Sequence, residues 1–250
     1  MMGWALDLDG VVWLDDEPIA GSAAAIARLR EAGEDVVFCT NLSLRPVHEV
    51  EEKLARHGIL AEGAVLTSAL AAATLVQPGE RVLLCAGAGA EEALLERGAE
   101  VVRDGPADAV VVGLHLDFDY EALRRATAAV RGGARLIGTN DDPTFPTPAG
   151  LVPGGGAILA AVAVAAGVEP EVAGKPYAPM AALVRERLGD GGVVVGDRAD
   201  TDGGLAVRLG YRFVLVLTGS TRTAEGLHPV PDVVCADLAE AVDQARSGSA

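Results

Sequence analysis

Two aspartates separated by one residue, Asp7 and Asp9, follow a short apolar run near the start of the chain. Side chains two positions apart on a strand point to the same face, so both carboxylates can address one site. Neighbouring carboxylates repel each other unless they share a cation, and Mg²⁺ is a hard ion that takes oxygen ligands. Gly10 then allows a sharp backbone turn. Taken alone, this pattern is more typical of a solvated strand end.

Three later segments also place polar side chains beside apolar runs. Thr40 and Asn41 follow a buried strand pattern and carry groups that can donate to phosphate oxygens. Lys175 precedes a predicted helix and offers a compact positive charge suited to a phosphoryl group. Asp197 and Asp202 follow a run of valines, where several carboxylates are costly without a cation. Singly, these segments are typical of a turn, a surface lysine and a helix cap.

Short apolar runs alternate with longer helical patterns along the chain. This alternation indicates parallel βαβ units, and the continuous Val/Leu runs fit strands buried on both faces. Ligands in such sheets sit at the carboxyl ends of the strands, where the polar segments fall. We therefore predict an α/β fold with a doubly wound parallel sheet. Ser22 is predicted to cap a helix, and the Pro/Gly-rich segment 141–156 is predicted to be a loop.

The composition limits the class of protein. Half of the 250 residues are hydrophobic, which is ample for a packed core, and the net charge of −16 argues against nucleic acid or an anionic membrane as partner. No signal peptide or membrane-spanning stretch is apparent. Three widely spaced cysteines make a disulfide framework or a zinc site improbable. A cytoplasmic, reducing location is the default expectation.

The four polar segments occur in an order that resembles a known family. They are similar to the four motifs of the haloacid-dehalogenase (HAD) superfamily of phosphatases: DLDGV at 7–11, Thr40-Asn41, Lys175 and GDxxxxD at 196–202. The longer context resembles the NagD-like, class IIA branch with a C2-type cap, which includes p-nitrophenyl phosphatases and phosphoglycolate phosphatases. That likeness is carried by the segments 139–148, 150–156 and 174–176, and it covers essentially the whole chain.

The resemblance implies a mechanism in which Asp7 attacks phosphorus and forms an aspartyl-phosphate. Asp9 would protonate the leaving alcohol and then deprotonate the attacking water. Asp7, the backbone carbonyl of Asp9 and Asp197 would bind Mg²⁺. This division is physically sensible, because phosphoryl transfer depends mainly on charge neutralisation and in-line positioning.

The resemblance also assigns the groups that hold the phosphate. Thr40, Asn41 and Lys175 would bind its oxygens. Asp202 would orient Lys175 or a metal-bound water. The expected ligand is a small phosphorylated metabolite: a sugar phosphate, phosphoglycolate, glycerol phosphate or a nucleotide. Similar proteins form cap-mediated dimers, so we expect a homodimer.

In architecture, the resemblance implies a Rossmann-like core formed by residues 1–77 and 172–250. An inserted α/β cap domain, residues 78–171, would cover the site and exclude water. Asn140 and Asp142 are the expected substrate contacts from the cap. Together these expectations describe a two-domain phosphatase with a discontinuous core.

Two positions depart from the family pattern. Leu42 stands where the family commonly has a second asparagine, so one polar contact near the phosphate is expected to be absent. Asp141 stands where proline is frequent, which affects the shape of the cap loop and hence the choice of substrate. Neither change touches the four motif residues Asp7, Asp9, Lys175 and Asp197.

Three alternative functions are open to the same sequence. Gly87-Ala88-Gly89 follows a strand pattern, but Glu92 stands where a dinucleotide-binding fingerprint needs its third glycine. A dehalogenase would share the nucleophile but has no need of Asp9, because halide leaves without a proton. A non-catalytic module that binds phosphate or Mg²⁺ would likewise not need the proton transfer of Asp9.

Overall fold

The computed structural model describes residues 2–147 and 150–246, so Pro148 of the segment 139–148 lies outside the described residues. The chain forms two compact units. Unit 1 combines the described residues of Met1–Thr40, Val50–Leu66 and Lys175–Ala250, whereas unit 2 combines Asn41–Glu49 and Thr67–Gly174. The domain boundaries implied by the family resemblance stay a prediction.

Unit 1 is built on a six-stranded sheet with the strand order β15-β14-β13-β1-β4-β5. Its strands are β1 (Gly3–Leu6), β4 (Asp35–Thr40), β5 (Val65–Thr67), β13 (Gly192–Gly196), β14 (Arg212–Val216) and β15 (Val233–Cys235). The strands from β15 to β4 pair in parallel. Leu6 of β1 pairs with Val195 of β13, so the aspartates that follow these strands emerge at one edge.

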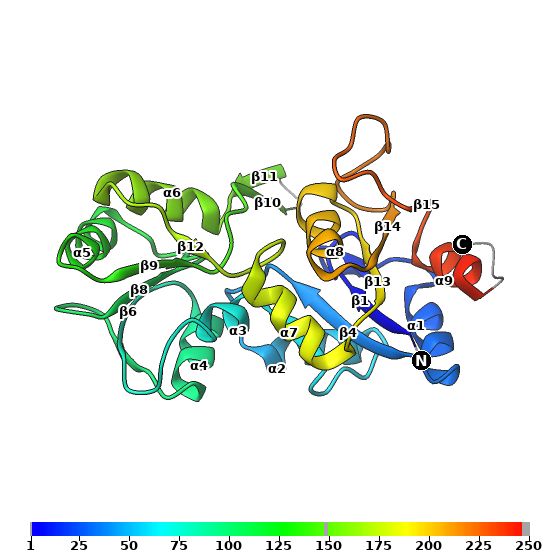
Figure 1. Ribbon diagram of the computed structural model, residues 1–250, viewed down its shortest axis with the longest axis horizontal. Coiled ribbons are helices and arrows are strands. Elements are labelled where there is room, and N and C mark those ends of the chain that lie inside the picture. The colour runs from blue at the N-terminus through cyan, green and yellow to red at the C-terminus, as the bar shows by residue number, and fades with distance from the viewer. Residues whose placement is uncertain (1, 148–149, 247–250) are drawn as a thin grey trace. The chain divides into compact units, whose positions relative to one another are not determined.

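Helices cover both faces of this sheet (Figure 1). On one face α1 (Ser22–Glu31) packs against α9 (Leu238–Arg246), and on the other α7 (Ala178–Leu188) packs against α8 (Gly204–Leu209). Large side chains such as Trp4 and Phe38 are fully buried between these layers. The result is the predicted doubly wound parallel sheet, which is confirmed.

Unit 2 has its own parallel sheet of five strands, ordered β12-β9-β8-β6-β7. The strands are β6 (Arg81–Cys85), β7 (Glu100–Val102), β8 (Ala109–Val112), β9 (Arg135–Gly138) and β12 (Glu171–Val172). Figure 1 shows α5 (Tyr120–Arg131) and α6 (Gly155–Ala166) together on one face, and α3 (Ser68–Ala73) and α4 (Ala88–Glu96) on the other. The prediction of an inserted second α/β domain is confirmed at the level of fold.

Two local predictions are wrong. The segment 141–156 is not a continuous loop, because it contains an antiparallel hairpin of β10 (Thr144–Thr147) and β11 (Gly150–Pro153). Ser22 is the first residue of α1 rather than its cap: the cap position is Gly21, and the Ser22 hydroxyl donates to the Val11 carbonyl at 2.9 Å. The serine therefore ties the helix to the turn after β1.

Three elements near the candidate site complete unit 1. A two-residue pair of strands, β2 (Trp13–Leu14) and β3 (Glu17–Pro18), forms a hairpin soon after β1. A π-helical turn, Ala199–Gly203, connects β13 to α8. Most of α2 (Val47–Arg56) also belongs to this unit.

Two broader expectations can be compared with the structure. Cys39, Cys85 and Cys235 are all buried and free. Within residues 2–147 and 150–246, none of the helices combines the length and apolar character needed to cross a membrane.

Candidate active site

A tight turn after β1 begins the candidate site. Leu8 is fully buried, and its carbonyl accepts the main-chain N–H of Val12 at 2.8 Å. Gly10 has a φ of +85°, a conformation that side chains disfavour. A Cβ atom on Gly10 would lie 2.8 Å from both the Asp197 carboxylate carbon and the Gly219 Cα atom. The turn therefore requires glycine, both for its conformation and for the close approach of Asp197.

Three buried carboxylates gather at the carboxyl edge of the unit 1 sheet. One oxygen each of Asp7, Asp197 and Asp202 lies within 4.8 Å of the others. Asp7 continues β1, and its main-chain N–H donates to the Val195 carbonyl of β13 at 2.9 Å. Asp197 follows β13 and accepts a hydrogen bond from the main-chain N–H of Ser220. The sheet register thus brings together aspartates almost two hundred residues apart.

Lys175 lies between two of these carboxylates. Its Nζ atom donates to Asp7 Oδ1 at 2.7 Å and to Asp202 Oδ1 at 2.6 Å, and the residue is only 3% exposed. Burial disfavours its charge, but the carboxylates of Asp202 and Asp7 outweigh this and raise its pKa well above the usual value. Lys175 is therefore a fixed positive charge inside the cluster.

The cluster nevertheless carries more negative than positive charge. Burial raises the pKa of Asp7 to about 6, although Lys175 opposes this shift, and nearby Asp197 adds to it. Burial raises the pKa of Asp202 to about 6 in the same way, and that of Asp197 also lies above its ordinary value. Three buried carboxylates beside one ammonium form a set of hard oxygen donors that fits a divalent cation such as Mg²⁺.

Asp9 lies outside this cluster, and its side chain is exposed. Its Oδ1 atom accepts a hydrogen bond from the indole Nε1 of Trp13 at 3.0 Å. Leu8 is buried between the two aspartates, and Asp7 belongs to the buried cluster whereas Asp9 does not. Asp7 is thus the buried and Asp9 the accessible member of the pair.

The other predicted residues are divided between the units. Thr40 ends β4 in unit 1 and is buried. In unit 2, Asn41 donates from Nδ2 to Asp142 Oδ2 at 2.9 Å, and Asn140 donates from Nδ2 to the Asn41 carbonyl at 2.8 Å. Ser68 donates to the same carbonyl at 2.7 Å. Asn41, Asn140 and Asp142 therefore form one hydrogen-bonded group within unit 2.

Two contributors were not assigned from the sequence. The loop after β14 supplies the Ser220 N–H to Asp197 and places Gly219 against it. The available signal is the Gly-Ser pair that follows the buried strand β14 after two intervening residues, since it falls at the same edge of the sheet. The second contributor is Trp13, whose hydrogen bond to Asp9 cannot be read from spacing along the chain.

A doubly wound parallel sheet with a lysine-bridged carboxylate cluster at its carboxyl edge suits a metal-dependent hydrolase. Family models agree with this class: one for haloacid dehalogenase-like hydrolases matches residues 4–100, and a second HAD-like hydrolase model matches residues 172–241. The acid sugar phosphatase of Staphylococcus aureus (strain USA300) is 35% identical over 248 residues, with 96% of each chain covered.

Solved structures give the same result. The p-nitrophenyl phosphatase from Archaeoglobus fulgidus is 32% identical and superposes with a TM-score of 0.90, covering 97% of this chain and 98% of that one. The magnesium complex of the glycerol phosphate phosphatase from Mycobacterium tuberculosis is 35% identical, with a TM-score of 0.88, covering 94% of this chain and 74% of that one.

The chain belongs to the haloacid dehalogenase-like hydrolase family, and the predicted likeness to its NagD-like phosphatases is confirmed. It is an enzyme, a phosphoric monoester hydrolase. Phosphatases of this family use Mg²⁺, and the cluster of Asp7, Asp197 and Asp202 suits that cofactor.

Proposed function

We propose that the enzyme hydrolyses small phosphate monoesters through an aspartyl-phosphate formed on Asp7. The observation that carries this proposal is the position of Lys175, which bonds both Asp7 and Asp202 inside the buried cluster. A lysine fixed within 3 Å of the attacking carboxylate supplies positive charge where a phosphoryl group would arrive. Such a charge is needed because the molecule as a whole is strongly negative.

The reaction has two steps. In the first, an Asp7 oxygen forms a bond to phosphorus, the bond from phosphorus to the ester oxygen breaks, and Asp9 gives its proton to the leaving oxygen. In the second, Asp9 takes a proton from water, whose oxygen attacks phosphorus and releases phosphate and free Asp7. The exposed side chain of Asp9 supports this role, because a proton donor must reach an atom of the substrate.

The remaining residues hold the reacting groups. Asp7, Asp197 and the main-chain carbonyl of Asp9 are the proposed ligands of Mg²⁺, which when bound would neutralise charge on the phosphoryl oxygens. Thr40 and Asn41 would donate to those oxygens. Asp202 holds Lys175 in place, a role supported by their 2.6 Å contact.

We propose a small phosphorylated metabolite as the substrate. Relatives carry the names acid sugar phosphatase, glycerol phosphate phosphatase and p-nitrophenyl phosphatase, which favours a compact polyol or sugar ester. Phosphoglycolate and nucleotides remain in the set to be tested. We propose that Asn140 and Asp142 contact the alcohol part of the ester. Their amide and carboxylate groups can bind hydroxyls, and both residues are hydrogen-bonded to Asn41 in unit 2.

The first experiment measures release of phosphate from p-nitrophenyl phosphate and from a panel of these metabolites, ranked by kcat/KM. Activity is expected with Mg²⁺ and should disappear with EDTA. A wild-type enzyme that binds Mg²⁺ yet turns over no ester across a broad pH range would favour the non-catalytic binding module instead.

Replacing the nucleophile tests the assignment of Asp7. The variant Asp7→Asn should lose more than about 10³-fold in kcat, because the amide cannot form the acyl-phosphate. Circular dichroism should show an unchanged fold. Near-normal turnover by this variant would move the nucleophile to another residue.

A homodimer in a reducing compartment is also proposed. Apolar side chains on the surface of unit 2 favour self-association, among them Tyr120 (80% exposed) and Val164 (83% exposed). The three free, buried cysteines suit a reducing compartment. Light scattering of the purified enzyme tests the dimer: a mass near that of one chain would contradict it.

A further inference from the structure

The chain contains two tryptophans, and their indole N–H groups are in opposite situations. Trp4 lies in β1 within the core, and its Nε1 has no hydrogen-bond partner among the described residues. Trp13 begins the β2–β3 hairpin, and its Nε1 donates to Asp9 Oδ1 at 3.0 Å. Only one of the two therefore acts on a residue of the proposed reaction.

The backbone brings Trp13 back to Asp9. The two residues form an isolated β-bridge across the four-residue separation, and the N–H of Gly10 donates to the Trp13 carbonyl at 2.7 Å. The Trp13 side chain is itself buried, with only 3% of the residue exposed. A buried, rigid ring thus presents its one polar atom to an exposed carboxylate.

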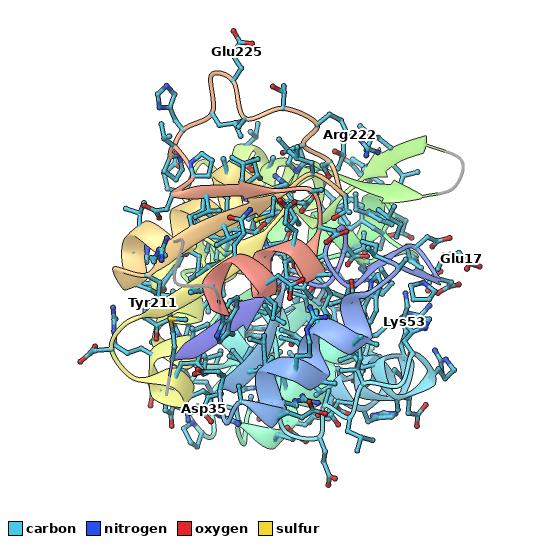
Figure 2. The ribbon with its side chains drawn as sticks, turned by 90° about the vertical axis from the view of Figure 1, so that its right-hand side faces the viewer. Glu17, Asp35, Lys53, Tyr211, Arg222 and Glu225 are labelled. Carbon is cyan, nitrogen blue, oxygen red and sulfur yellow. The ribbon has the colours of Figure 1, made fainter. Side chains whose placement is uncertain are left out.

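Lys53 of α2 lies over the Trp13 ring. Its Nζ atom lies 4.3 Å from the centre of the Trp13 ring, in a cation–π contact. The same Nζ atom is 3.2 Å from Asp16 Oδ1 and also donates to the Asp15 carbonyl. Figure 2 shows Lys53 and Glu17, the first residue of β3, on the same flank of the molecule. Lys53 therefore fixes both the indole and the turn of its hairpin.

We propose that Trp13 is a positioning residue for Asp9: its indole N–H holds the carboxyl group in the rotamer that exchanges a proton with the substrate, and Lys53 holds the indole. This inference rests on the proposed acid–base role of Asp9. An exposed aspartate otherwise samples several side-chain rotamers, and proton transfer requires hydrogen-bond reach to the leaving oxygen. Trp13 removes that freedom without touching the substrate itself.

Leaving groups of different basicity separate positioning from general damage. An alkoxide needs the proton of Asp9, whereas p-nitrophenolate leaves with little help. The variant Trp13→Phe keeps an aromatic ring at this position but removes the five-membered part of the indole together with its N–H. It should lower kcat for an alkyl phosphate by about tenfold, a part of the 10²–10⁴-fold that general acid catalysis supplies. It should lower kcat for p-nitrophenyl phosphate far less and leave KM nearly constant.

Trp4→Phe is the matched control, because it shrinks another buried indole in the same way, and the N–H that it removes has no partner among the described residues. It should leave kcat for both substrates unchanged. The double variant Asp9→Asn/Trp13→Phe completes a mutant cycle: if Trp13 acts through Asp9, the double variant should lose no more than Asp9→Asn alone. A merely structural role of Trp13 would instead give additive losses.

An NMR spectrum, which does not depend on turnover, tests the hydrogen bond between Trp13 and Asp9 directly. The ¹⁵N-labelled protein should show two indole cross-peaks in a ¹H–¹⁵N correlation spectrum, and single Trp→Phe variants assign them. In Asp9→Ala the Trp13 proton resonance should move upfield, because it loses a carboxylate acceptor, while the Trp4 resonance stays. If the Trp13 resonance does not move, the bond does not exist in solution and the inference is overturned.

The kinetic outcomes distinguish this inference from the proposed function. In one outcome, the losses in Asp9→Asn depend strongly on the leaving group while Trp13→Phe behaves as wild type. That outcome would overturn the inference and leave the role of Asp9 intact. Equal losses for both substrates in Trp13→Phe would also overturn it. Equal losses in Asp9→Asn would reject the acid–base role of Asp9, and the inference with it.

Discussion

At the scale of single residues, Lys175 is the centre of the site. Its ammonium group partly neutralises the charge of the buried carboxylates of Asp7 and Asp202, and it also offers positive charge to an incoming phosphate. Those two duties compete, because each hydrogen bond to Asp7 ties up the group that must attack phosphorus. Mg²⁺ beside the same carboxylates would relieve this competition by supplying further positive charge.

Removing this lysine should damage stability as well as activity. Lys175→Met leaves Asp7 and Asp202 buried without their cation, and breaking such a buried pair costs about 3–5 kcal/mol. Urea unfolding of the Mg²⁺-free protein should show this loss in the free energy of unfolding. The variant Lys175→Met/Asp202→Asn should regain part of that stability and none of the turnover. Equal stability of wild type and Lys175→Met would mean that the ion pairs do not persist in solution.

Single residues also show how far sequence reasoning reaches. Asp7, Lys175, Asp197 and Asp202 could be grouped from the sequence because each stands at the end of a strand or the start of a helix, and parallel strands share an edge. Trp13 could not be assigned to Asp9, because spacing along the chain does not tell where a side-chain N–H points. Its bond depends on a turn conformation fixed by Gly10.

At the scale of elements, the turn from β1 to the hairpin sets the geometry of the site. Gly10 combines a positive φ with van der Waals crowding from Asp197 and Gly219. Gly33, at the end of α1, has a similar φ of +78° but nothing within 4 Å of an added Cβ atom. A side chain at Gly33 would therefore meet only an unfavourable backbone conformation, whereas a side chain at Gly10 would also collide with its neighbours.

Alanine at these two glycines should have different effects. Gly33→Ala should lower the free energy of unfolding by about 1–2 kcal/mol, the cost of a left-handed residue with a side chain, and leave kcat unchanged. Gly10→Ala carries the same backbone cost and in addition displaces Asp197, so Mg²⁺ affinity and kcat should both fall. Isothermal titration with Mg²⁺ and steady-state kinetics measure this. Matching Mg²⁺ affinities in the two variants would contradict the crowding argument.

The elements that the sequence predicted best are long or strongly apolar. The helix α5 buries Ala122, Ala126 and Val130 at helical spacing, and the strand β8 is a continuous run of buried apolar residues. The β10–β11 hairpin was missed because its prolines and glycines are typical of a loop, and its strands are held by pairing with each other. The two-residue strands β2 and β3 are too short to carry a periodic pattern.

At the scale of the whole molecule, charge is the dominant feature. A net charge of −16 repels phosphate esters at long range, so binding depends on local cations and on the bound metal. The cluster of Asp7, Asp197 and Asp202 adds to this negative field at the place where the substrate must react. Metal binding is therefore expected to affect stability as well as catalysis.

Mg²⁺ should stabilise the enzyme more at pH 7.5 than at pH 5. Without metal, the pKa values of Asp7 and Asp202 are about 6 in the folded state, above their ordinary value of 3.8. The folded state then binds more protons than the unfolded chain between about pH 4 and 6, so stability falls as pH rises through this window. Mg²⁺ replaces those protons. At a hundred times its Kd it should add about 2.7 kcal/mol at the higher pH.

Thermal melts with Mg²⁺ or EDTA at the two pH values measure this effect. For a chain of this size the Tm should rise by about 5–10 °C at pH 7.5 and clearly less at pH 5. Asp197→Asn is the control, because it removes a proposed ligand and should abolish the rise. An equal rise at both pH values would show that the metal does not compete with protons at these carboxylates.

The insertion of unit 2 has a consequence for biosynthesis. The sequence of unit 2 is complete at Gly174, whereas the sheet of unit 1 lacks β13 until Gly196 has been added. A chain that grows from its N-terminus therefore contains Asp7 and the whole of unit 2 before Lys175 and Asp197 are added. The inserted unit has its whole sequence available for folding on the ribosome before the catalytic edge can assemble. Any nascent chain that stops before Lys175 carries the nucleophile without its counter-ion.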